Sequence, residues 1–167
     1  MPNWCSNSFA ITGNVESIRE LWEAAQTAGP DGGFGLLNAI APIGEWDYGT
    51  AVDTWGTKWD VSDEGLEFVD NGDGTASISG WFDSAWAPPV GAYEQLAADF
   101  DSCVIECSYF EPGMDFAGFW SSENGEEHMD NLHDVWENDP DNELFKRLDE
   151  EYNLVEQFEE WEAEFEE

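Results

Sequence analysis

The last eighteen residues of the chain, EEYNLVEQFEEWEAEFEE (150–167), limit most strongly how it can fold. Nine of them are glutamate and none is basic. Like charges three or four residues apart destabilise a helix by about 0.2–0.5 kcal/mol per pair. A helix in this segment is therefore stable only if burial of its apolar side chains offsets the repulsion.

The apolar side chains of the C-terminal region recur at helical spacing. They are Leu144, Phe145, Leu148, Tyr152, Leu154, Val155, Phe158, Trp161 and Phe165. The pattern predicts a single helix from Pro140 or Asp141 to about Glu166, roughly 39 Å long at 1.5 Å per residue. Burying one large apolar side chain stabilises a protein by roughly 1.5–3 kcal/mol, more than a like-charged pair costs. We therefore expect this helix to dock on the rest of the chain, or on a second copy in a homodimer.

The excess of acidic residues extends over the whole chain. It contains 39 Asp and Glu against four Lys and Arg, which gives a net charge of −35. Residues 123–167 hold 19 of the acids and two of the bases, a net charge of −17. A field of this sign repels nucleic acids and anionic membranes, which argues against direct binding to either. The expected partner is cationic, either a basic protein surface or a divalent metal ion.

The pattern of the first 122 residues predicts an α+β fold. Aromatic residues make up 15 % of the chain, which is atypical of disordered acidic proteins. Strands are expected at 4–12, 103–110 and 114–120, a hairpin around DNGDG within 65–82, and helices at 14–27 and 90–100. This order predicts a ferredoxin-like split β-α-β sandwich at 1–122 with both helices on one sheet face. An acidic helical extension follows at 123–167, with a short helix at 126–138.

Tryptophan is unusually frequent, and its positions predict where part of the core lies. The expected core tryptophans are Trp4, Trp22, Trp81 and Trp86. Trp55 and Trp59 flank GTK and suit either a core or an interface. No structure is predicted for residues 36–60.

Four stretches together resemble a known family. They are MPNWCSN (1–7), WGTKWD (55–60), AWAPP (85–89) and YFEPGMDFAG (109–118). They are similar to the YubB-type ferredoxin-like proteins of phages and plasmids, over about residues 1–122. The resemblance implies a ferredoxin-like fold and an origin in a mobile element, and it implies no catalytic residues.

The acidic C-terminal region predicts a DNA mimic. Carboxylates on rigid helices imitate the phosphates of DNA and occupy the groove of a basic DNA-binding protein of the host. A defence system of the restriction or CRISPR type is the expected target, which makes the protein an anti-restriction or anti-CRISPR inhibitor. The candidate phosphate surrogates are Asp130, Asp134, Glu137, Asp139, Asp141, Glu143, Glu150, Glu151, Glu156, Glu159, Glu160, Glu162, Glu164, Glu166 and Glu167. The alternative is a halophile-adapted mobile-element protein whose acidic coat keeps it solvated without mimicry.

The sequence supports a metal site or a catalytic site less than it supports a DNA mimic. Cys103 and Cys107, with His128 and His133, have pair spacings that zinc sites use. A strand at 103–110 would separate the two thiols by about 13 Å, so we expect core thiols, helical histidines and no cofactor. The chain contains no G-x-S-x-G or H-E-x-x-H motif, and we expect a protein that is not an enzyme. A hydrolase that uses two of the many carboxylates stays open.

The N-terminus, MPNWCSNSFAITG, has no basic or apolar signal region, and no apolar run reaches about 18 residues. The three cysteines show no disulfide pattern. We therefore expect a cytoplasmic protein, in the interior of a host cell.

Overall fold

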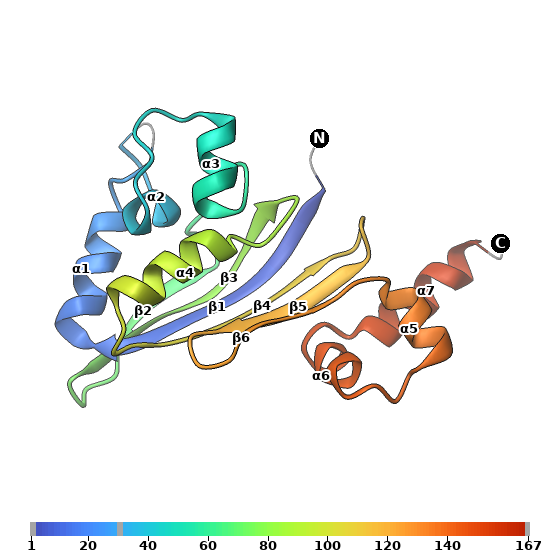
Figure 1. The fold of residues 1–167 in the computed structure, drawn as a ribbon. Coiled ribbons are helices and arrows are strands. Elements are labelled where there is room, and N and C mark those ends of the chain that lie inside the picture. Colours follow the sequence, from blue (N-terminus) through green and yellow to red (C-terminus); the bar gives the residue numbers. More distant parts are fainter. Residues whose placement is uncertain (1–2, 30–31, 166–167) are drawn as a thin grey trace.

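The computed structural model describes residues 3–29 and 32–165, which form one antiparallel sheet with helices on both of its faces (Figure 1). Its elements are β1 (Trp4–Asn14), α1 (Val15–Ala25), α2 (Leu36–Ile40), α3 (Tyr48–Trp55), β2 (Leu66–Asp70), β3 (Thr75–Ala85), α4 (Val90–Asp99), β4 (Val104–Glu111), β5 (Phe116–Ser121), β6 (Gly125–Met129), α5 (Leu132–Asn138), α6 (Glu143–Tyr152) and α7 (Leu154–Phe165).

The six strands lie in the order β2-β3-β1-β4-β5-β6, and every neighbouring pair is antiparallel. The first four strands with α1 and α4 form the split β-α-β arrangement, which confirms the predicted ferredoxin-like fold. β5 and β6 then widen the sheet as a meander on the side of β4. The sheet therefore continues past residue 122, where the sequence pattern places the start of a helical extension.

Alternation along the central strand sorts side chains between the two faces of the sheet. Cys5, Phe9 and Ile11 of β1 are buried, as predicted, and Phe9 and Ile11 belong to the larger core beneath α1, α2 and α4. The side chain of Asn14 caps α1, because its Oδ1 accepts hydrogen bonds from the backbone N–H groups of Glu16 (2.9 Å) and Ser17 (3.4 Å). We call the face of the sheet that carries Phe9, Ile11 and this larger core the first face.

Residues 36–60, for which the sequence predicts nothing, contain α2 and α3. The carboxylate of Asp60 accepts hydrogen bonds from the backbone N–H groups of Leu37 (2.7 Å) and Asn38 (2.9 Å) at the start of α2. A cap that is supplied from more than twenty residues away leaves no local sequence signal. The side chain of Asp47 caps α3 by accepting from the N–H of Thr50 at 3.0 Å.

Two predicted helices of the C-terminal region are wrong in their extent. The segment 126–138 is not one helix, because Gly125–Met129 pairs with β5 as β6 and α5 begins only at Leu132. The expected single helix from 140 to 166 is broken at Asn153, whose backbone is left-handed (φ 53°). Asparagine tolerates this conformation and ends α6, so that α7 starts in a new direction. The break allows Leu148 before it and Leu154 after it to be buried in the same core.

The second face of the sheet carries this smaller core, which holds the C-terminal helices in place. Phe110 of β4 and Ala117 of β5 are buried there with side chains of α5, α6 and α7: Leu132, Phe145, Leu148, Leu154 and Phe158. Two hydrogen bonds join α5 to the β4–β5 turn, because Asp115 accepts from the backbone N–H (3.0 Å) and from Nδ1 (2.8 Å) of His133. The acidic helices thus pack on the chain's own sheet.

Three of the four tryptophans that the sequence places in the core are exposed. Trp4, Trp81 and Trp86 expose 45 %, 57 % and 47 % of their surface, whereas Trp22 is partly buried against the larger core. Trp81 lies on the second face, and the C-terminal helices cover only one end of that face. Strand alternation alone does not reveal that the area around Trp81 is uncovered. Trp55 is buried and Trp59 is half-exposed.

The helix break at Asn153 gives a first prediction. Replacing Asn153 by Ala should lower the free energy of unfolding by about 1–2 kcal/mol, because a Cβ without a compensating polar group disfavours the left-handed conformation. Replacing it by Gly should cost a few tenths of a kcal/mol at most, since glycine adopts this conformation freely. Urea denaturation followed by circular dichroism measures both. Equal stability of the Ala and Gly variants would mean that Asn153 does not set the break.

Candidate partner-binding surface

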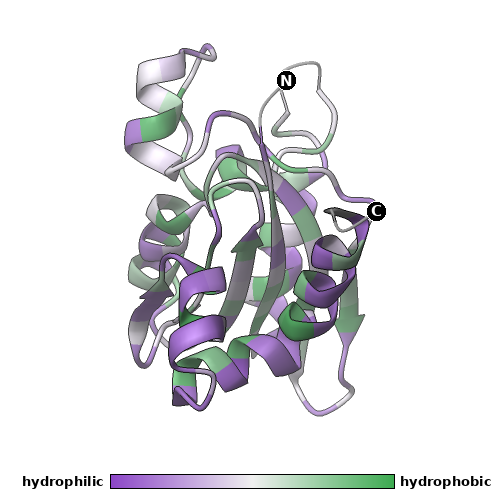
Figure 2. Cartoon of the chain, turned by 90° about the vertical axis from the view of Figure 1, so that its right-hand side faces the viewer, coloured by the Kyte–Doolittle hydropathy of each residue, from purple (hydrophilic) through white to green (hydrophobic). Residues whose placement is uncertain are grey.

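The structure describes thirteen of the fifteen predicted phosphate surrogates, and all thirteen are solvent-exposed. They are Asp130, Asp134, Glu137, Asp139, Asp141, Glu143, Glu150, Glu151, Glu156, Glu159, Glu160, Glu162 and Glu164. Glu166 and Glu167 lie outside the described residues. Figure 2 views the molecule from the side of α5–α7, and hydrophilic residues alternate there with hydrophobic ones along the helices. We call these thirteen residues the acidic surface.

The densest part of the acidic surface is α7. Its buried stripe contains Leu154 and Phe158, and its carboxylates point away from that stripe: Glu156, Glu159, Glu160, Glu162 and Glu164. Twelve residues at 1.5 Å each span roughly 18 Å, which gives one carboxylate per about 3.6 Å. A single DNA strand carries one phosphate per about 3.4 Å of axis. The axial charge density of the helix is therefore close to that of one strand rather than to that of a duplex.

The four basic side chains of the chain are already engaged within it. Arg147 donates to Glu127 at 2.8 Å and lies 4.6 Å from the ring centre of Phe119. Lys146 is 3.9 Å from Asp141, and Arg19 is 3.3 Å from Asp70. The fourth base, Lys58, lies over the ring of Trp59 at 4.4 Å. Within residues 3–29 and 32–165, most of the carboxylates of the acidic surface consequently have no Lys or Arg side chain beside them.

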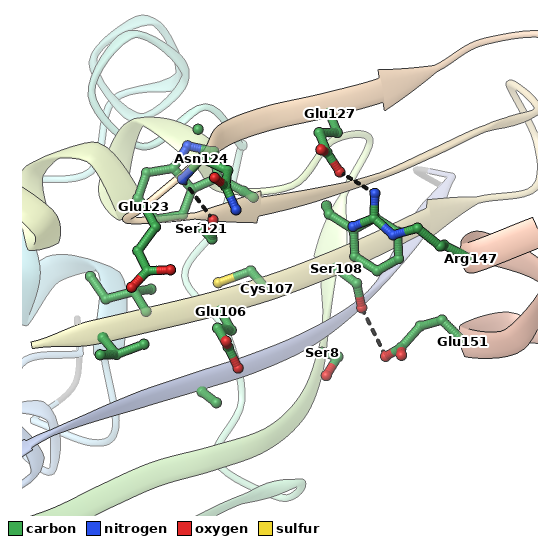
Figure 3. A pocket seen from close by; sticks show the side chains of 16 residues that line it. Ser8, Glu106, Cys107, Ser108, Ser121, Glu123, Asn124, Glu127, Arg147 and Glu151 are labelled. Atoms are coloured by element: carbon green, nitrogen blue, oxygen red, sulfur yellow. Dashed lines mark hydrogen bonds and ion pairs between the residues drawn. The ribbon is translucent and has the colours of Figure 1, made fainter. Parts of the chain in front are cut away.

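A hollow of about 350 Å³ adjoins the acidic surface on the second face of the sheet (Figure 3). Strands β1, β4, β5 and β6, the β5–β6 turn and α6 form its walls. Four carboxylates line it, from Glu106, Glu123, Glu127 and Glu151, together with the single cation Arg147. The hollow is thus net negative and continues the charge of the helices across the sheet.

Hydrogen bonds fix the end of the hollow that lies next to α6. The hydroxyl of Ser108 donates to Oε1 of Glu151 at 3.0 Å and is 2.9 Å from the hydroxyl of Tyr152. Burial raises the pKa of Tyr152 above its ordinary value, so this phenol stays protonated. Burial likewise raises the pKa of Cys107, whose thiol lies in the larger core on the first face of the sheet. Since neither the phenol of Tyr152 nor the thiol of Cys107 is ionised, the negative charge near Ser108 comes from carboxylates.

Of the four acids that line the hollow, the predicted set contains Glu151 and omits Glu106, Glu123 and Glu127. Glu106 occupies an outward position of β4, and Glu123 lies in the β5–β6 turn. The alternation of exposed and buried residues along 103–110 is the signal that could have identified Glu106. The predicted mimic relies on carboxylates that helices carry, whereas Glu106 lies on a strand.

The cysteine and histidine residues with zinc-like spacing do not come together. Cys103 and Cys107 belong to the larger core on the first face. His128 accepts a hydrogen bond at Nδ1 from the hydroxyl of Tyr109 (2.7 Å) and donates from Nε2 to Asp130 (2.9 Å). His133 stacks on Phe158 with ring centres 3.9 Å apart. Within residues 3–29 and 32–165, no three His, Cys, Asp or Glu side chains are arranged to hold a metal ion.

Among the described residues, no helix has both the length and the apolar composition that a membrane span needs.

Comparisons with known proteins match this chain through its ferredoxin-like fold and not through its acidic charge. Residues 54–158 match the family model described as the ferredoxin-like domain in Api92-like protein. The protein api92 from Yersinia pseudotuberculosis has a similar solved structure, with a TM-score of 0.55 and 10 % identity over 78 % of this chain and 98 % of that chain. No curated protein sequence matches. At this identity the structural likeness concerns the fold alone.

The matched residues reach from the end of α3 into α7, beyond position 122, where the resemblance in the sequence motifs ends. The ferredoxin-like part of that resemblance is confirmed, whereas the family found is the Api92-like one and not the YubB type. More than half of the chain falls within the match, and the chain therefore belongs to the family of ferredoxin-like domains of Api92-like proteins.

Proposed function

We propose that this protein is a DNA mimic that inhibits a basic DNA-binding protein of a host cell by occupying its DNA groove. The observation that carries the proposal is the acidic surface: thirteen exposed carboxylates on the C-terminal region, one of which, Glu151, also lines a hollow with three further carboxylates and one base. Within this proposal the protein acts by binding and not by catalysis, and it uses no cofactor.

The geometry supports mimicry of one DNA strand at α7. The five carboxylates of this helix have an axial charge density close to that of a strand, and the docked apolar stripe restricts how far they can move. A rigid anion array loses little conformational freedom on binding, which favours affinity over that of a flexible acidic tail. The net charge of −35 would also accelerate encounter with a basic groove and make the affinity fall with salt.

The identity of the target class rests on the sequence motifs. Their similarity to YubB-type proteins of phages and plasmids favours a mobile-element protein that meets host defences, so a restriction enzyme or a CRISPR effector is the proposed target. The family match itself concerns the ferredoxin-like domain.

The second candidate is a halophile-adapted protein with a solvating acidic coat. The observation that favours it is the spread of charge, because residues 1–122 hold the other 20 acids and a net charge of −18. Exposed acids lie on α1 and α4 as well, far from the acidic surface.

Neutralising α7 tests the mimic. The variant with Glu156, Glu159, Glu160, Glu162 and Glu164 replaced by Gln should bind the target at least about tenfold more weakly, because it removes charges that face the groove. A matched control neutralises five exposed acids around the first-face helices: Glu20, Glu23, Glu94, Asp99 and Asp101. Both variants change the net charge by the same amount, and the control should bind within about threefold of the wild type.

The tagged protein and both variants are used to capture proteins from nuclease-treated host lysate at low and high salt. Support requires one dominant DNA-binding protein that high salt releases and that a duplex of about 30 base pairs displaces. Equal capture by the wild type and the α7 variant would overturn the assignment to α7. Capture of many unrelated basic proteins would favour the acidic coat.

Salt dependence of folding separates the two candidates. A mimic should remain folded and unfold cooperatively at 50 mM NaCl, because two apolar cores hold it together. A halophilic protein should lose structure at this salt concentration, since only screening offsets its repulsion. Far-UV circular dichroism between 50 mM and 2 M NaCl decides, and loss of the helical signal below about 0.5 M would contradict the mimic.

A further inference from the structure

A second cavity lies on the first face of the sheet, away from the acidic surface. Its volume is about 470 Å³, and it lies between α2, the end of α3 and residues 59–62. Aromatic and aliphatic side chains dominate its walls: Phe34, Ile43, Trp46, Trp55, Trp59 and Val61. This size and composition are typical of pockets for small organic ligands.

Hydrogen bonds hold the walls of this cavity in place. The indole Nε1 of Trp46 donates to the carbonyl oxygen of Lys58 at 2.9 Å, and that of Trp55 donates to the carbonyl oxygen of Ala41 at 2.8 Å. Asn38 bridges Ala28 and Ile43, donating from Nδ2 to one (2.8 Å) and accepting at Oδ1 from the other (3.0 Å). Because the indole donors of Trp46 and Trp55 are engaged, these two tryptophans offer a ligand their ring surfaces rather than hydrogen bonds.

Among the described residues that line the cavity, Asp60 is the only charged one. Its carboxylate accepts from the backbone N–H groups of Leu37, Asn38 and Val61, at 2.7, 2.9 and 2.8 Å. A carboxylate has about four acceptor positions, so one remains. Burial raises the pKa of this carboxyl in spite of the three donors. A cation beside Asp60 would offset the cost of its burial.

The neighbouring Lys58 shows that an indole of this wall accommodates an ammonium group. Its Nζ lies 4.4 Å from the ring centre of Trp59 and 6.0 Å from that of Tyr48. The faces of tryptophan attract cations more strongly than those of other aromatic side chains. Lys58 is not among the cavity-lining residues, so its ammonium does not fill the space.

We propose that this cavity binds a small organic cation, an amine or quaternary ammonium compound with an apolar body. The apolar body lies among Phe34, Ile43 and Trp55, and the cationic head lies between the ring of Trp46 and the carboxylate of Asp60. This binding is a separate activity from DNA mimicry, and it does not depend on the acidic surface.

The probe that tests the proposal is benzyltrimethylammonium, with 2-phenylethanol and benzenesulfonate as uncharged and anionic aromatic controls. Isothermal titration of the full chain in 150 mM NaCl should give a Kd below about 1 mM for the cation only. The variant Trp46→Leu should bind the cation at least about fivefold more weakly, equal to about 1 kcal/mol. Trp46 is 48 % exposed, so this replacement leaves the packed core intact.

The matched control is Trp81→Leu, which removes a tryptophan of similar exposure (57 %) from the second face and should leave the affinity unchanged. A second variant, Asp60→Asn, keeps an oxygen acceptor at the start of α2 and should weaken binding of the cation. Equal affinity of Trp46→Leu and the wild type would overturn the proposal, because it would mean that the net charge alone attracts the probe. Equal affinity for 2-phenylethanol and the cation would also overturn it.

Discussion

The apolar contact between the C-terminal helices and the second face of the sheet is the interaction on which the acidic surface depends. Phe145 and Leu148 of α6, with Leu154 and Phe158 of α7, are almost fully buried there. Each contributes roughly 1.5–3 kcal/mol, whereas each like-charged pair along α7 costs about 0.2–0.5 kcal/mol. Without the face that Phe110 and Ala117 provide, α7 would be a short, strongly repulsive helix with no means of persisting in water.

The same contact determines where the charge is presented. Since Leu154 and Phe158 must face the sheet, the glutamates between and beyond them are forced outward in a fixed register. The four bases are paired or stacked within the chain, so they do not neutralise this outward array. Folding therefore presents the carboxylates of the C-terminal helices as one array, and a basic partner that binds this array gains electrostatic free energy from it.

Local signals in the sequence predicted the elements that they specify, and contacts between distant residues decided the rest. The cap at Asn14, the hairpin around DNGDG and the alternation of β1 are encoded within a few residues, and the structure confirms them. The start of α2 depends on Asp60, more than twenty residues away, which no local pattern reveals. The apolar repeat of 144–161 predicted a buried stripe correctly, but it did not reveal the bend at Asn153, because asparagine is also compatible with a continuing helix.

For the candidate site too, the sequence predicted what local periodicity specifies and missed what distant contacts decide. The exposure of the predicted carboxylates follows from helical periodicity, which separates Leu154 and Phe158 from the glutamates around them. The hollow beside Ser108 does not follow from periodicity. It arises where α6 meets β4 and the β5–β6 turn, three segments that only the tertiary fold brings together. The exposed Trp81 has the same origin, since the C-terminal helices leave the part of the second face that contains it uncovered.

The aromatic cavity and the acidic surface are both suited to cations, but different physical terms govern them. They lie on opposite faces of the sheet, and charges separated by more than about 8 Å are largely screened at physiological salt. The glutamates of α7 therefore add little to binding at Trp46 and Asp60, where a desolvated carboxylate and the ring faces act at contact distance. Conversely, the acidic surface has no comparable enclosure, so it favours a partner that presents many positive charges over one that presents a single cation. Under the two proposals, selectivity for a small cation at the cavity follows from burial, and selectivity for an extended basic groove at the acidic surface follows from charge density.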